Sequence, residues 1–176
     1  MDFKQAVTTC FSKYATFSGR ATRPEYWWFF LFGILGSIAA SILDGLFFGA
    51  ATLAADVTET TASFSAISDG PIGAIFSLAI VLPSLSVGWR RMHDTGRSGL
   101  YLLYPLLVMI GIGTFLAIFG SLGAPETGGM AAPVVIITLF ASVVLALSPL
   151  IVLWWLTRPS QPGSNDFGPN PKKVSQ

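Results

Sequence analysis

The stretch YWWFFLFGILGSIAASIL at residues 26–43 contains no charged side chain, and the apolar run resumes after Asp44 as far as Phe48. An α-helix rises about 1.5 Å per residue, so about 20 apolar residues cross a bilayer core that is about 30 Å thick. This stretch is long enough for one crossing. It therefore predicts a transmembrane helix and indicates a membrane protein.

The composition of the whole chain agrees with this class. The 176 residues suit one domain, 52% of them are hydrophobic, and the mean hydropathy is +0.66. Charged residues make up 11%, against about 25% in an ordinary soluble domain, which excludes a water-soluble globular enzyme and a disordered chain. A net charge of +1 gives no basis for nucleic-acid binding, and one cysteine and one histidine make a metal site or other cofactor unexpected.

Three further stretches lack charge, at residues 70–89, 98–125 and 127–157. Glu126 lies among glycine and proline residues that indicate a turn between the last two stretches. We therefore predict an all-α, polytopic fold that forms a single membrane domain over residues 1–176. Its four transmembrane helices are expected at about 26–48, 72–90, 99–122 and 131–156.

The charges predict the orientation of these spans. All ten basic residues fall in the N-terminal segment, the connection between the second and third spans, and the tail at about 157–176. The outer loop at about 49–71 and the turn at Glu126 contain no lysine or arginine. Because positive charge stays in the cytoplasm during insertion, we expect both termini to be cytoplasmic. All five tryptophans lie at the predicted cytoplasmic helix ends, where indole rings favour the headgroup level.

Two segments outside the spans have patterns of their own. Residues 3–17 place apolar side chains at helical spacing and predict a short amphipathic helix, which lies on the cytoplasmic leaflet or packs against the bundle. Cys10 is on its apolar side. Within the spans, Pro83, Pro105 and Pro149 are expected to interrupt three helices at similar depth, with Ser84 or Ser148 bonding to the carbonyl groups that they free.

Three unusual strings fall on the predicted cytoplasmic face: FSGRATRPEYWWF at 17–29, RRMHDTGRSG at 90–99 and PGSNDFGPNP at 162–171. Together they resemble the signature of the domain of unknown function 805 family of small bacterial inner-membrane proteins. The most specific part is His93, Asp94, Gly96, Arg97, Ser98 and Gly99. The resemblance extends from about Phe3 to Pro171. It implies a four-span protein of the bacterial plasma membrane and implies no reaction.

The middle string has the chemistry of an anion site. The chain leaves one helix and enters the next within this string, and Ser98 is placed to cap the third helix, whose free N–H groups attract anions. Arg90, Arg91 and Arg97 add positive charge, which suits the phosphate of an anionic phospholipid headgroup. In the alternative, Arg–Asp and Arg–Glu pairs lock the helix ends together.

His93 and Asp94 also allow a catalytic interpretation, in which the protein is an enzyme or carrier acting on a lipid-linked phosphate with His93 as acid or base. No nucleophile elbow, P-loop or HExxH string supports it. We therefore favour a non-catalytic protein whose cytoplasmic face binds a membrane lipid headgroup or a partner protein. A homo-oligomer and a structural subunit of a membrane complex stay open. The candidate binding residues are Arg20, Arg23, Glu25, Arg90, Arg91, His93, Asp94, Arg97, Ser98 and Asn165.

Overall fold

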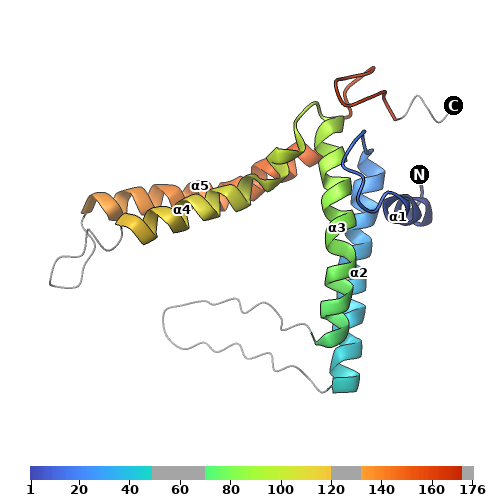
Figure 1. Ribbon diagram of the computed structural model, residues 1–176, viewed down its shortest axis with the longest axis horizontal. Helices are drawn as coiled ribbons and strands as arrows, with labels where there is room; N and C mark the ends of the chain where they lie inside the picture. The colour runs from blue at the N-terminus through green and yellow to red at the C-terminus, as the bar shows by residue number, and fades with distance from the viewer. Residues whose placement is uncertain (49–69, 120–131, 172–176) are drawn as a thin grey trace. The chain divides into compact units, whose positions relative to one another are not determined.

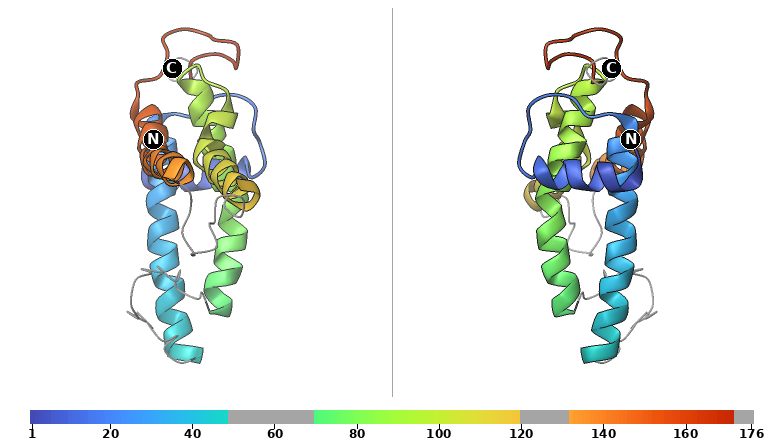
Figure 2. Two further views of the ribbon diagram at one scale, coloured as in Figure 1. Left: turned by 90° about the vertical axis from the view of Figure 1, so that its left-hand side faces the viewer. Right: turned by 90° about the vertical axis from the view of Figure 1, so that its right-hand side faces the viewer.

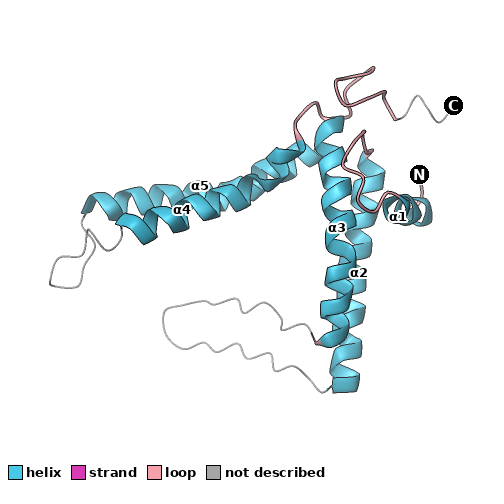
Figure 3. Cartoon of the chain, in the orientation of Figure 1, coloured by secondary structure: helices cyan, strands magenta, loops and turns pink. Residues whose placement is uncertain are grey.

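The computed structural model describes residues 1–48, 70–119 and 132–171 of the chain (Figures 1 and 3). Within these residues the chain forms helices and turns, with one isolated bridge between Asn165 and Gly168. The expectation of an all-helical fold is confirmed for these described ranges. The elements in chain order are α1 (Phe3–Ser12), α2 (Arg23–Phe48), α3 (Pro71–Asp94), the 3₁₀ helix η1 (Gly99–Leu103), α4 (Tyr104–Phe119) and α5 (Ala132–Thr157).

Among the described residues, three helices are long and apolar enough to cross a membrane: α2, α3 and the Val135–Thr157 part of α5. The Gly99–Phe115 segment is apolar and shorter. The predicted outer loop and the turn at Glu126 lie outside the described residues. The chain divides into two compact units, one formed by residues 1–17 and 24–87 and the other by residues 18–23 and 88–176.

In the first unit, α1 packs on α2 through aromatic rings. Phe3 lies edge-on to Trp28 with ring centroids 5.9 Å apart, and Phe11 contacts Phe29 at 5.7 Å. Cys10 is fully buried, as its place on the apolar side predicted. These contacts place aromatic side chains of α1 against α2.

The segment after α1 is bonded to α3 at the position that Pro83 disrupts. Proline has no N–H, so the carbonyl of Ala79, four residues earlier, loses its helical donor. The Tyr14 hydroxyl donates to this carbonyl at 2.8 Å, and the Ser86 hydroxyl donates to the carbonyl of Lys13 at 3.0 Å. Tyr14, rather than the expected Ser84, therefore bonds to the freed carbonyl, because the segment after α1 lies against this turn.

The other two prolines behave differently from each other. Pro149 lies inside α5, and the Ser148 hydroxyl donates to the freed carbonyl of Leu145 at 2.8 Å, as predicted. Pro105 is the second residue of α4, where no helical N–H is required. Pro105 thus lies where the predicted span at 99–122 changes from η1 to α4, at the start of an α-helix rather than inside one. The chain enters α4 through η1, in which the Tyr104 N–H bonds to the carbonyl of Tyr101.

Helices α2 and α3 are neighbours in the first unit (Figures 1 and 2). Phe32 and Phe76 have ring centroids 6.0 Å apart, and Phe76 fills the space beside Gly36. At the far end of this pair, Asp44 of α2 caps α3. Its Oδ1 accepts the N–H of Ile72 at 2.9 Å, and its Oδ2 accepts the N–H of Gly73 at 2.7 Å.

This cap explains the local sequence at the start of α3. Pro71 occupies the first helical position, where its missing N–H costs nothing. Gly70 precedes it, because a Cβ there would collide with the Asp44 carboxylate. Asp44 is 5% exposed, and a negative charge is favourable at a helix N-terminus. One carboxylate thus joins the two helix ends.

We expect Asp44→Ala to lower the free energy of unfolding by about 2 kcal/mol, because two N–H groups at the start of α3 lose a charged acceptor. The purified protein should melt about 5 °C lower in thermal unfolding followed by tryptophan fluorescence. Asp44→Asn, which keeps one acceptor oxygen, should fall between. Asp166→Ala, which removes an exposed carboxylate, is the control. An unchanged melting temperature for Asp44→Ala would exclude this cap as a source of stability.

Candidate functional site

The second unit contains the end of α3, η1, α4, α5, the tail and residues 18–23. Its site is built around the Asp94 carboxylate, which is fully buried. Asp94 Oδ1 accepts the Nε–H of Arg20 at 3.0 Å and lies 3.0 Å from Arg20 Nη2. Asp94 Oδ2 accepts from Nη1 of Arg91. We call Arg20, Arg91 and Asp94 the arginine–aspartate cluster.

Arg20 uses its other donors on the tail. Nη2 donates to the carbonyl of Gln161 at 2.7 Å, and Nη1 donates to the carbonyls of Gly163 at 2.8 Å and Gly168 at 3.4 Å. A guanidinium group presents five N–H donors in a rigid fork, whereas a lysine has three on one nitrogen. This geometry therefore requires arginine at position 20.

Arg91 and Arg23 close the C-terminal end of α5. The last carbonyls of a helix have no partner within it, and cations are favourable there. Arg91 donates from Nε to Leu156 at 3.0 Å and from Nη2 to the carbonyl of Arg158. Arg23 donates from Nε to the same Arg158 carbonyl at 2.8 Å. Side chains from the strings at 17–29 and 90–99 thus bond to the free carbonyl groups at the end of α5.

The turn after α3 is a Schellman motif, in which a glycine of positive φ ends the helix. Gly96, at φ 76°, donates to the carbonyl of His93, and Arg97 donates to the carbonyl of Met92. A Cβ at position 96 would collide with the Gln161 side chain. The helix consequently extends to Asp94 instead of ending at about residue 90, and this carries Asp94 into the cluster.

Asn165 ties the tail to this turn. Its Oδ1 accepts the N–H of Phe167 at 3.0 Å, and its Nδ2 donates to the carbonyl of His93 at 2.9 Å. The backbone N–H of Gln161 donates to the carbonyl of Asp94 at 3.0 Å. The described part of the tail forms turns, with positive φ at Gly163 and Gly168.

The His93 ring is held by contacts other than Asp94. Its Nδ1 lies 3.0 Å from the carbonyl oxygen of Gly19, which can only accept, so Nδ1 carries a proton. The ring stacks on Phe167 with centroids 3.9 Å apart and planes at 6°. The two oxygens of Asp94 bond to arginines. The adjacent pair in the sequence therefore does not have the geometry of an acid–base dyad in which Asp94 orients the imidazole.

Three other candidate residues, Arg90, Glu25 and Ser98, lie outside the arginine–aspartate cluster. Arg90 is buried, and its carbonyl accepts the N–H of Ala21 at 3.0 Å. Glu25 is buried in the first turn of α2 and belongs to the first unit. The Ser98 hydroxyl accepts the N–H of Leu100 at 3.4 Å, so it caps η1 rather than a full α-helix.

Arg97 lies against an aromatic ring. Its guanidinium carbon is 5.2 Å from the ring centroid of Trp155, and its Nη1 donates to the carbonyl of Thr95 at 3.2 Å. Arg158 makes the same kind of contact with Trp154 at 4.8 Å. We call these two contacts the arginine–tryptophan pairs. In both, a cation lies over the negative face of an indole ring, and the side chain of Arg97 stays half-buried while that of Arg158 is exposed.

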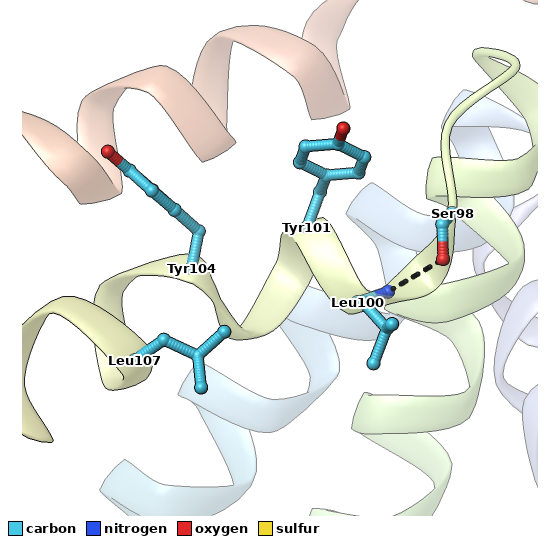
Figure 4. Close-up of a pocket in the computed structure, with 5 residues that line it drawn as sticks. All are labelled: Ser98, Leu100, Tyr101, Tyr104 and Leu107. Atoms are coloured by element: carbon cyan, nitrogen blue, oxygen red, sulfur yellow. Dashed lines mark hydrogen bonds between the residues drawn. The ribbon is translucent and has the colours of Figure 1, made fainter.

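A cleft of about 350 Å³ opens beside this turn (Figure 4). Its lining comes from Ser98, from η1 and from the start of α4: Ser98, Leu100, Tyr101, Tyr104 and Leu107. The rings of Tyr101 and Tyr104 project to one side of this segment in Figure 4. Tyr101 also lies edge-on to Trp155, with ring centroids 5.3 Å apart.

The sequence matches the family described as "Protein of unknown function (DUF805)" over residues 14–169. The chain belongs to this family. It is 26% identical over 159 residues to "Inner membrane protein YhaH" of Escherichia coli K12, with 90% of this chain and 89% of that protein covered. It is 30% identical over 106 residues to "Inner membrane protein YhaI" of the same organism, with 60% of this chain and 75% of that protein covered. No solved structure shows significant similarity.

The DUF805 match and the apolar helices agree on a bacterial membrane protein with transmembrane helices. The site also contains residues that the candidate set omitted. Nothing in the sequence singles out Gln161, because its backbone carbonyl rather than its side chain accepts the hydrogen bond from Arg20. Trp155 and Arg158 were visible as an anchoring ring and a basic residue, and only their packing shows that they form arginine–tryptophan pairs.

We expect Asp94→Asn to lower the free energy of unfolding by about 3–5 kcal/mol, because it leaves two buried guanidinium groups without a counter-charge. Tryptophan fluorescence during thermal unfolding of the detergent-purified protein measures the change. Asp166→Asn, at an exposed position of the tail, should leave the melting temperature unchanged. A loss of less than about 1 kcal/mol for Asp94→Asn would show that the cluster does not hold this unit together.

Proposed function

We propose that the protein is a non-catalytic integral protein of the bacterial inner membrane with four transmembrane helices and both termini in the cytoplasm. Its cytoplasmic face binds an anionic phospholipid headgroup. The observation that carries this proposal is the placement of the Arg97 guanidinium group on Trp155, at the turn between α3 and η1.

The arginines of the three strings divide into two groups. Those of the arginine–aspartate cluster are buried and donate to protein acceptors, so we assign Arg20 and Arg91 to holding the tail and the end of α5. Those of the arginine–tryptophan pairs, Arg97 and Arg158, have more exposed side chains. We do not place Glu25, Arg23 or Arg90 in contact with the headgroup.

The environment of the arginine–tryptophan pairs favours a lipid over a soluble anion. Indole rings concentrate at the headgroup level of a bilayer. Anionic lipids of the cytoplasmic leaflet attract a basic side chain near the surface by about 1 kcal/mol. An arginine held flat on an indole ring keeps N–H groups at its edge, and these suit a phosphate oxygen.

The headgroup proposal is tested by native mass spectrometry of protein extracted gently from its own membrane. We expect wild type to retain an anionic phospholipid and Arg97→Ala to lose it. Arg97→Lys, which keeps the charge without the planar group, should retain less than wild type. Lys4→Ala, which removes an exposed charge from α1, should retain as much. The proposal fails if retention does not depend on Arg97.

Other outcomes of that experiment assign the surface differently. A second copy of the chain, or an associated protein, that is lost only in Arg97→Ala would make this face a protein contact. If wild type changed the mass of a retained lipid-linked phosphate on incubation and His93→Ala did not, the protein would instead catalyse a reaction at this site.

The orientation is tested by reporter fusions in a bacterial host. A fluorescent protein fused after Gln176 should fluoresce, because it folds in the cytoplasm, and alkaline phosphatase fused at residue 60 should be active, because it folds outside. Replacing the three arginines at positions 90, 91 and 97 by alanine should weaken this preference, since they supply the positive charge of the central connection. The reverse pattern of activities would exclude the proposed topology.

A further inference from the structure

The largely apolar cleft lined by Ser98, Leu100, Tyr101, Tyr104 and Leu107 lies next to the arginine–tryptophan pair of Arg97 and Trp155. Ser98 follows Arg97 directly in the chain. Tyr101 contacts the indole ring of Trp155, which also carries the Arg97 guanidinium group. Leu107 lies on α4, one turn beyond Tyr104. The cleft therefore has leucine and tyrosine side chains in its lining and a guanidinium group beside it, at the turn before η1.

The side chains of the cleft are open on their outer side. Leu100 and Leu107 are each 58% exposed, and Tyr101 is 48% exposed. They belong to the apolar Gly99–Phe115 segment. Such exposure of leucine is unfavourable in water and favourable against lipid chains. The lining also includes Tyr101 and Tyr104, whose hydroxyls suit the ester and glycerol oxygens of a phospholipid.

We propose that this cleft holds the glycerol backbone and the first carbons of one acyl chain of an anionic phospholipid, whose phosphate lies at Arg97. The inference rests on the headgroup site proposed above and adds the part of the lipid that gives the site its selectivity. About 350 Å³ is at the small end of ligand cavities and takes a segment of a lipid rather than the whole molecule. A guanidinium group beside an apolar cleft suits a phospholipid, in which a phosphate is joined to acyl chains, and does not suit free phosphate.

The test fills the cleft without touching Arg97. Leu107→Trp adds bulk to the lining, and Leu106→Trp adds the same bulk at the neighbouring exposed position, which does not line the cleft. Delipidated protein in detergent is titrated with phosphatidylglycerol, and the bound fraction is read by native mass spectrometry. We expect the affinity to fall about tenfold in Leu107→Trp and in Arg97→Ala, and to stay within about twofold of wild type in Leu106→Trp.

Two further ligands distinguish binding of the headgroup from binding of the acyl chain. Glycerol phosphate, which has the charge and no chain, should not displace bound phosphatidylglycerol at equal concentration. Phosphatidylcholine, which has the chains and no net charge, should bind about tenfold more weakly than phosphatidylglycerol. Leu107→Phe serves as the second filling variant if Leu107→Trp does not elute as wild type.

The outcomes keep the two proposals apart. If Leu107→Trp and Leu107→Phe bind phosphatidylglycerol as wild type while Arg97→Ala does not, the cleft proposal is overturned and the headgroup site stands. If Arg97→Ala also binds as wild type, both are overturned. Displacement by glycerol phosphate at equal concentration would show a phosphate site without a chain-binding cleft, and would likewise overturn the inference.

Discussion

A single buried carboxylate, that of Asp94, holds two buried guanidinium groups, and the second unit depends on this arrangement. One negative charge for two positive charges leaves several N–H donors that need acceptors. Those donors reach the last carbonyls of α5 and the carbonyls of the tail. Asp94, by pairing with Arg20 and Arg91, therefore determines where the tail lies and how the final helix ends.

The same physical requirement governs the long helices. Lipid supplies no hydrogen bonds, so each backbone group freed by a proline or a helix end needs a partner from the protein. Tyr14 provides one for the turn at Pro83, Ser148 for the turn at Pro149, and Asp44 for the start of α3. The segment after α1 is thereby bonded to α3.

Arginine serves two roles in this protein. Buried arginines connect segments that are far apart in the chain, and their donors face carbonyls and one carboxylate. The side chains of Arg97, in the turn before η1, and of Arg158, just after α5, lie on the indole rings of the last turn of α5. This division is the basis of our proposals that the lipid headgroup binds at the arginine–tryptophan pairs and that part of its acyl chain lies in the adjoining cleft.

The sequence by itself determined the long helices α2, α3 and α5, because a long apolar run in a bilayer satisfies its backbone groups internally as a helix, and it identified Arg20, Arg91 and Asp94 through unusual polar strings. It left open whether Asp94 pairs with arginines or orients His93, and it did not show that Tyr14 bonds at Pro83. Those outcomes depend on which side chains meet across distant segments. The tertiary structure also decided that Pro105 begins a helix and that Gly96 makes room for Gln161, since steric fit is a property of the packed chain and not of local pattern.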